Sequence, residues 1–252
     1  MRSAPSCLPA LLPFCLSILV VPSLAEAQGD WNGRFRISAN GGGQIAGGGV
    51  SQAFTVQKNL EPAPITFDFD ASRTSWFDGG IVAHIRGRWA VGAAVSFSAH
   101  DADAGVKASI AHPFFFNQAR LVGGTLAATR TELAVHLDAV YLLAARGRLE
   151  LAVSGGASIF NATQTMITDV AYTDTYPFDT ATFASAPAIG STTTVGGFNV
   201  GADVTWKRWR RVGVGALLRF AHASAAFAAS PNNTATSDVG GLQAGGGVRL
   251  AF

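Results

Sequence analysis

The chain ends in the alternating segment Gly240–Phe252, which reads GGLQAGGGVRLAF. Its even positions are apolar or glycine and end on phenylalanine, whereas its odd positions are small except for one glutamine and one arginine. Successive side chains of a β-strand point to opposite faces. The segment therefore predicts a strand with one apolar face and one small or polar face.

The same period of two recurs along the chain. It is clearest in four internal segments, at residues 89–97, 133–143, 149–159 and 212–220. Short basic connections occur at Arg86–Arg88, Arg146–Arg148 and Lys207–Arg211. Between them lie long stretches rich in Ser, Thr, Asn, Asp and Pro, at about residues 48–75, 100–130, 161–194 and 224–238. Short turns that alternate with long loops are typical of a one-sided membrane barrel.

Counting strands around the short turns gives eight. They are expected near residues 33–46, 76–86, 89–99, 131–144, 148–160, 195–206, 212–223 and 239–252. The predicted fold is all-β, an eight-stranded antiparallel transmembrane β-barrel with short periplasmic turns, long extracellular loops and both termini in the periplasm. A soluble secreted barrel or sandwich would also alternate. It is disfavoured because the second face carries Gly, Ala and Ser with few charges, too little polarity for a water-facing surface.

The first 27 residues are predicted to be a cleaved signal peptide. Arg2 precedes an apolar core at residues 8–21, and Ala25-Glu26-Ala27 is a small-x-small cleavage site. The predicted mature domain spans residues 28–252. Both cysteines, Cys7 and Cys15, leave with the signal, so neither a disulfide nor a thiolate metal site is expected.

Composition excludes several functions. Charged residues make up 13% of the chain, against roughly 25% in typical soluble domains. The net charge of +2 lacks the concentrated basic face that nucleic-acid binding needs. No mature segment reaches the ~18 apolar residues of a membrane helix. Hydrophobicity spread over alternate residues, with 29 glycines, favours a membrane barrel.

The strand pattern, the signal and the terminal Phe252 resemble the small bacterial outer-membrane β-barrel families, which include the OmpA-, OmpX- and OmpW-like barrels. The segments 112–117, 130–136 and 176–179 (HPFFFN, RTELAVH and YPFD) resemble a subgroup without an assigned activity. The resemblance implies a Gram-negative outer membrane, contact with its lipid and lipopolysaccharide, and Phe252 as the signal for the barrel-assembly machinery. It implies no catalytic or cofactor residues.

The polar side chains that face inward are expected to form a lumen network. Its predicted ionisable members are Arg36, Arg86, Glu132, His136, Asp138, Glu150, Asp203, Arg219 and Arg249. His84, Asn199 and Gln243 share their faces. Buried charges must be paired, and an eight-stranded interior is just wide enough for side chains to fill. A salt-bridged plug is therefore expected, with a narrow polar path or a small-solute site as the alternative.

Two further groups invite a functional interpretation. His136 and Asp138 lie on one face of a strand, and with an inward hydroxyl such as that of Ser154 they would suggest nucleophilic catalysis. The His-x-Ser-Asn signature of lipid A deacylases is absent, and a buried, hydrogen-bonded histidine is expected instead. Phe114, Phe115 and Phe116 are expected in the outer aromatic girdle or beneath other loops. The alternative is a lid for a hydrophobic ligand, with Tyr172, Tyr176 and Phe178 completing the cluster.

The predicted function is a structural or surface-interaction role for a monomeric outer-membrane barrel with a plugged lumen. The alternative is a narrow porin-like or OmpW-like protein that passes or binds small or hydrophobic molecules. A lipid A-modifying enzyme comes third, so no enzymatic activity is expected. No cofactor, metal or nucleic acid is expected. The expected partners are membrane lipid, lipopolysaccharide, the assembly machinery, and either an unknown surface partner or a small hydrophobic ligand.

Overall fold

The computed structural model describes residues 33–46, 49–230 and 233–252. The predicted signal peptide, residues 1–27, lies outside this part of the chain. The described residues form strands and connections without any helix. The strands are β1 Phe35–Ala46, β2 Val50–Lys58, β3 Glu61–Phe69, β4 Arg73–Arg86, β5 Trp89–Ala111, β6 Ala119–Arg146, β7 Leu149–Ile167, β8 Ala171–Asp174, β9 Ala181–Ser185, β10 Ala188–Lys207, β11 Val212–Ser230 and β12 Asn233–Ala251.

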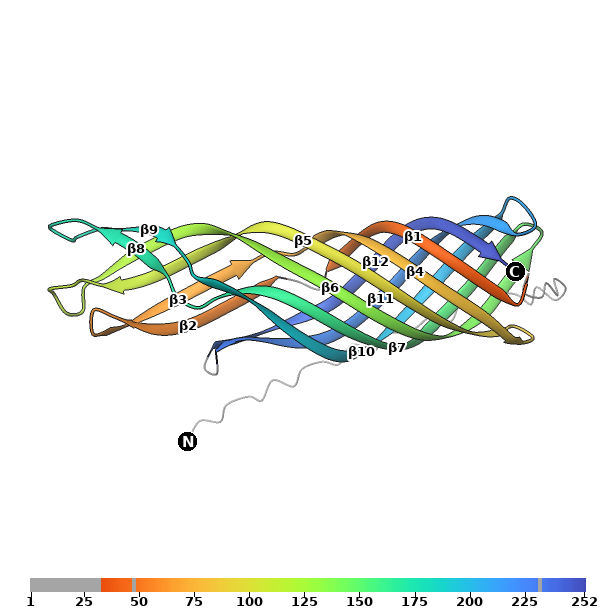
Figure 1. Cartoon of the computed structure of the whole chain (residues 1–252), viewed down its shortest axis with the longest axis horizontal. Coiled ribbons are helices and arrows are strands. Elements are labelled where there is room, and N and C mark those ends of the chain that lie inside the picture. The colour runs from red at the N-terminus through yellow and green to blue at the C-terminus, as the bar shows by residue number, and fades with distance from the viewer. Residues whose placement is uncertain (1–32, 47–48, 231–232) are drawn as a thin grey trace, which may run out of the picture.

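Eight of these strands close into an antiparallel ring. The order around the ring is β1, β4, β5, β6, β7, β10, β11 and β12, so chain neighbours pair throughout. The first and last strands close it, with Arg36 opposite Ala251 and Ile45 opposite Leu242. The eight-stranded antiparallel barrel predicted from the sequence is therefore confirmed. Figure 1 shows it as a long tube with steeply tilted strands.

The short turns and the C-terminus meet at one end of the tube (Figure 1). Gly87 and Gly147 adopt positive φ in the two tight turns, a conformation that glycine adopts without steric cost. The amide of Arg34 donates to the Phe252 carbonyl at 2.6 Å, and the Phe252 amide donates to Phe35 O at 2.9 Å. Gly33 is required here, because a Cβ on it would lie 2.5 Å from Phe252 O.

The long connections are mostly strand, which corrects the prediction of irregular loops. β5 and β6 run on together to Ala111 and Ala119, far beyond the expected ends near residues 99 and 131. The segment between β1 and β4 forms the β2–β3 hairpin, which pairs with β5 through Ile65–Asp68. We call this extension beyond the barrel the stalk. Its strands were missed because their larger apolar residues face inward, the reverse of the pattern nearer the turns.

Strand β5 contains this reversal without any change of register. Its odd residues point outward from Trp89 to Ser109. From Trp89 to Phe97 they are mainly apolar, whereas Asp101, Asp103 and Lys107 follow farther along. The inward residues change in the opposite sense, from small and polar side chains to Ala104, Val106, Ala108 and Ile110. The outer surface of the tube is therefore suited to lipid in the half near the short turns and to water in the stalk.

The apolar belt has an aromatic edge on each side. Phe77 faces Phe97 across β4 and β5, and Phe198 lies 6.2 Å from Phe220 between ring centroids, all near the stalk. At the turn end, Trp89 and Tyr141 pack with centroids 4.9 Å apart. The belt on β5 spans Trp89 to Phe97, which agrees with the ~9–11 residues of a tilted membrane strand. Among the described residues no helix is long and apolar enough to span a bilayer.

The interior contains two large apolar clusters away from the short turns. One closes the distal part of the barrel with Phe160, Met166, Phe227 and mainly small neighbours. The other fills the stalk, where Ile65 and Phe67 of β3 pack with Val106 and Ile110 of β5. Because the stalk has its own core, it can hold its three hairpin ends in a defined arrangement.

Candidate functional site

The lumen near the turn end contains a network of ion pairs. Asp203 on β10 accepts from Arg249 on β12 at 2.5 Å and lies 3.9 Å from Arg36 on β1. Glu150 on β7 lies 3.7 Å from Arg36 and also pairs with Lys207. These charges come from four strands, so the network links the wall across the lumen. Four of the five members, all except Lys207, belong to the lumen network predicted from the sequence.

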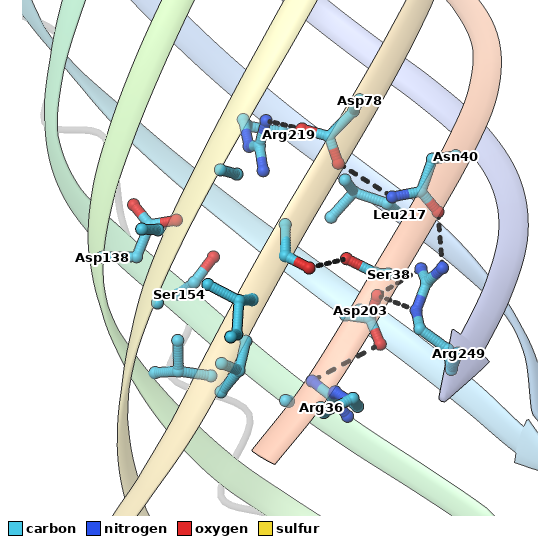
Figure 2. A pocket seen from close by; sticks show the side chains of 18 of the residues that line it. Arg36, Ser38, Asn40, Asp78, Asp138, Ser154, Asp203, Leu217, Arg219 and Arg249 are labelled. Carbon is cyan, nitrogen blue, oxygen red and sulfur yellow. Dashed lines mark hydrogen bonds and ion pairs between the residues drawn. The ribbon is translucent and has the colours of Figure 1, made fainter. Parts of the chain in front are cut away.

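A second group continues the network inward. Arg249 donates to Asn40 Oδ1, and Asn40 Nδ2 donates to Asp78 Oδ1 at 2.8 Å. Asp78 also accepts from Arg219 Nη1 at 2.8 Å. Figure 2 shows this continuous chain of contacts, with Asp138 placed apart from it on the opposite wall. Together these contacts connect β12, β1, β4 and β11.

A small cavity lies among these groups. Its volume is about 50 Å³, space for only a few water molecules. Arg219, Asp138 and Ser154 are among its lining residues (Figure 2). One carboxylate oxygen of Asp138, Oδ1, is buried without a hydrogen-bond partner in the protein. A cavity this small has room for water or a single small ion.

A third polar group closes the lumen toward the stalk. Arg130 pairs with Glu132 at 2.7 Å, and Glu132 accepts from the Gly240 amide and from Gln44 Nε2. Gln243 donates in turn to Gln44 at 3.0 Å. All four side chains are buried. This group therefore forms a second polar layer across the interior.

His136 lies between two hydroxyl groups. Its Nε2 is 2.9 Å from Ser96 Oγ and its Nδ1 is 2.8 Å from Ser158 Oγ, and the ring is fully buried. The expected buried, hydrogen-bonded histidine is therefore confirmed, and the alternative pairing of His136 with Asp138 is not formed, because the two serines occupy both ring nitrogens. Ser154 lines the cavity and bonds to neither group in the described structure. The arrangement tethers β5, β6 and β7.

The structure corrects one member of the predicted lumen network and adds others. Arg86 is exposed, because a register shift between His84 and Arg86 turns the end of β4 outward. Asp78 was missed although it shares the inward parity of His84 on β4. The other missed members are Asn40, Gln44, Arg130 and Lys207. Parity alone identifies Asp78 within its predicted strand, and it identifies Arg130 and Lys207 once their strands are extended to their true ends.

The exposed hydrophobic residues farthest from the belt gather at the end of the stalk. Three hairpin ends meet there: β2–β3, β5–β6 and β8–β9 (Figure 1). Their large exposed side chains, which we call the aromatic tip, are Leu60, Phe114, Phe115, Phe116 and Tyr176, with Phe178 half-buried among them. Phe114 is 69% exposed and Phe116 72%. Large apolar side chains exposed together mark an interaction site.

The aromatic tip is ordered by contacts beneath it. The buried ring of His112 accepts the amides of Phe114 and Phe115 through Nδ1, at 3.1 and 3.2 Å. The Asn117 amide donates to Glu61 Oε1 at 3.0 Å, which joins the β5–β6 end to β3. These contacts fix the backbone of the triple phenylalanine in one turn.

Arg120 holds the third hairpin end in place. It donates to Asp174 Oδ2 at 2.8 Å and to Phe178 O at 3.0 Å, both on the β8–β9 side. It also donates to Ala111 O at 3.0 Å on its own hairpin. One buried guanidinium therefore sets the β8–β9 end against β5–β6.

The expected position of the three phenylalanines is wrong. They lie neither in the outer aromatic girdle nor beneath other loops, because β5 and β6 continue as strands and lift them to the far end of the stalk. The predicted company of Phe178 and Tyr176 is confirmed: Phe114 lies 5.5 Å from Phe178, and Phe178 lies 6.1 Å from Tyr176, between centroids. Tyr172 lies below, under the Arg120 guanidinium.

The described residues contain no group of three His, Cys, Asp or Glu side chains that could hold a metal ion. The functional candidates are therefore the polar lumen network and the aromatic tip.

Comparison with known proteins yields matches in structure alone. No protein-family model and no curated protein matches the chain. Among solved structures, the outer membrane protein OprG from Pseudomonas aeruginosa is 10% identical, with 90% of this chain and 100% of that chain covered and a TM-score of 0.48. Ail, the attachment invasion locus protein of Yersinia pestis, is 9% identical, with 87% and 100% covered and a TM-score of 0.37. The outer membrane protease OmpT from Escherichia coli is 8% identical, with 90% and 99% covered and a TM-score of 0.43.

Matches this distant assign no activity, and the architecture rests on the chain's own pairing. A closed antiparallel ring satisfies all its backbone groups internally, which a lipid environment demands. Its exposed apolar belt and polar interior are those of a small outer-membrane β-barrel. The barrel therefore lies in the outer membrane with the belt in lipid.

Proposed function

We propose that this protein is a surface-contact protein of the outer membrane, in which a plugged barrel anchors a stalk that presents the aromatic tip outside the cell. The observation that carries the proposal is the exposure of Phe114, Phe115 and Phe116 on a backbone held by His112. Exposed apolar side chains lower solubility, so a group of them indicates a contact surface.

The lumen supports an anchoring role. Five carboxylates (Asp78, Glu132, Asp138, Glu150 and Asp203) share the interior with five cations (Arg36, Arg130, Lys207, Arg219 and Arg249). A balanced, hydrogen-bonded interior of this kind stiffens the wall and fills the space that a solute would need.

The orientation of the barrel tests the proposal directly. The sequence beyond residue 15 contains no cysteine, so single-cysteine variants can be labelled without background from the mature chain. Phe115→Cys places a thiol on the aromatic tip and Arg146→Cys places one on a short turn at the opposite end. In intact cells, a membrane-impermeant maleimide should label the first variant and should reach the second only after lysis. The reverse pattern would refute the proposal.

A further inference from the structure

The chemistry of the aromatic tip specifies the kind of surface that it contacts. The tip is a protrusion: the β5–β6 end consists of His112-Pro113-Phe114-Phe115-Phe116-Asn117, and its three aromatic rings are each more than half exposed. Beside it, Leu60 is 89% exposed and Tyr176 86%. A protruding apolar point suits a deformable apolar phase, whereas a protein partner would need a matching pocket.

The backbone of the tip is prepared for an environment without water. The amides of Phe114 and Phe115 are bonded to His112, and that of Asn117 to Glu61. The His112 amide donates to Gln118 O at 2.8 Å. Moving an unpaired backbone group into a lipid phase costs several kcal/mol, and these groups avoid that cost. Phe114 and Phe115 can therefore leave water with their amides already paired.

The charges around the tip disfavour attraction to an anionic surface. No lysine or arginine occurs in residues 112–119 or 175–180, and Arg120 is buried against Asp174. Lys58, at the β2–β3 end, is paired with Asp169. The exposed charged side chain at the tip is that of Asp179, 75% exposed. Peripheral helices and tails that bind anionic lipid do so through exposed Lys and Arg. The tip has the opposite balance, which suits a lipid surface with little net charge.

Distance separates the tip from the membrane that holds the barrel. From Phe97 at the belt edge to Ala111, β5 covers 14 residues, or roughly 46 Å along the strand at ~3.3 Å per residue. With a strand tilt of about 40°, this raises the tip by roughly 35 Å. Lipid at the tip must therefore belong to a second layer, and not to the bilayer around the belt.

The backbone is also strained where the three hairpins end. Leu60 and Phe178 both have positive φ, at 68° and 72°, which is rare for bulky residues. Asn117 has a φ of 59° in the β5–β6 end. Strain of this kind persists where the surrounding contacts enforce it and collects at functional sites. It supports a tip whose shape is set before contact.

From these observations we infer that the aromatic tip inserts into the outer leaflet of a second, weakly charged lipid bilayer, such as an apposed cell membrane or vesicle. The inference rests on the proposed surface role and names the surface. Phe114, Phe115 and Phe116 enter the acyl boundary, and Leu60 and Tyr176 rest at the headgroup level. Asp179 opposes binding to anionic lipid.

The test uses the full protein in a lipid nanodisc, which leaves the tip free, and vesicles of phosphatidylcholine as the probe. Flotation should recover the wild-type discs with the vesicles, and added salt should not release them. The double variant Phe114→Ser/Phe116→Ser should lose binding by roughly tenfold for each ring removed. Ile189→Ser, which removes an exposed apolar side chain from β10 in the stalk, should bind as the wild type does.

A second readout follows the tip itself. An environment-sensitive dye on Phe115→Cys should shift to the blue when neutral vesicles are added, and replacing part of the phosphatidylcholine by phosphatidylglycerol should weaken the shift. Binding that needs anionic lipid, or that salt abolishes, would overturn the inference. So would discs that capture a protein partner but never float with vesicles. If maleimide reaches Phe115→Cys from outside in intact cells but vesicles do not bind, the surface role survives and the lipid inference fails.

Discussion

Arg219 of β11 and Asp78 of β4 form an ion pair inside the barrel, with 2.8 Å between Nη1 and Oδ2. The two strands are not neighbours in the ring, since β1 and β12 lie between them. The pair therefore ties one side of the wall to another through the lumen. Both side chains are almost fully buried, so the contact is shielded from water and salt.

The first prediction concerns the stability that this pair provides. Arg219→Ala leaves Asp78 buried beside Asn40 without its cation, and loss of one partner of a buried pair costs about 3–5 kcal/mol. We expect the free energy of unfolding, measured with urea in lipid vesicles, to fall by that amount. Arg73→Ala, which removes an exposed arginine from the same strand as Asp78, is the control. Equal losses in both variants would contradict a lumen-spanning role.

The second prediction concerns conduction. Because polar groups fill the lumen at several levels and the cavity is about 50 Å³, we expect no steady channels from the folded protein in planar bilayers. Arg219→Ala should also be silent, since the Arg130–Glu132 group still closes the lumen toward the stalk. Reproducible channels that change with Arg219 would favour the alternative of a narrow channel.

The third prediction tests the border between belt and stalk. Val95 and Asp103 both point outward from β5, but Val95 lies in the belt and Asp103 in the stalk. Val95→Lys should destabilise the barrel in lipid by about 2–4 kcal/mol, because a lysine then faces the acyl chains. Asp103→Lys should change the unfolding free energy by less than about 0.5 kcal/mol. If both variants behaved alike in urea unfolding, the border would be misplaced.

The fourth prediction separates the tip from the barrel. Arg120→Ala removes the contacts to Asp174, Phe178 and Ala111 that hold the β8–β9 end. Limited proteolysis should then cut within residues 175–180. The barrel should stay folded in unheated detergent, which its migration in gel electrophoresis reports. Lys107→Ala, an exposed change on the stalk, should leave the digestion pattern unchanged. Cleavage within the barrel strands would instead indicate general unfolding.

The fifth prediction concerns the terminal residue. Phe252 closes the ring through its backbone to Arg34 and Phe35, and its side chain is 59% exposed. Phe252→Ala keeps the backbone bonds, so the purified variant should unfold at nearly the wild-type urea concentration. Its yield in the outer membrane should fall, as the assembly-signal hypothesis requires. Val248→Ala is the control. If the yield of Phe252→Ala equals that of the control, the assembly-signal hypothesis is wrong for this chain.

Much of the barrel could be predicted from local pattern because a membrane strand has a period of two and a clear contrast between its faces. Gly240–Phe252 and Trp89–Phe97 have that contrast, and both lie in the ring. In the stalk the contrast between the two faces reverses and weakens. Ala104 and Ala108 point inward, whereas Asp101 and Asp103 point outward. An apolar outer face therefore marks each strand only as far as the belt edge.

The candidate sites, too, could be predicted only in part from the sequence. By itself the sequence determined the closed barrel, its turn end and the inward side of Arg36, Glu132, Asp203 and Arg249, because alternation along one strand fixes which side chains share a face. The partners follow only from the folded structure: Arg219 with Asp78, His136 with two serines, and Arg120 with Asp174 beneath the tip. These contacts join strands or hairpins far apart in the chain, and register, bulges and strand length set them across the whole ring.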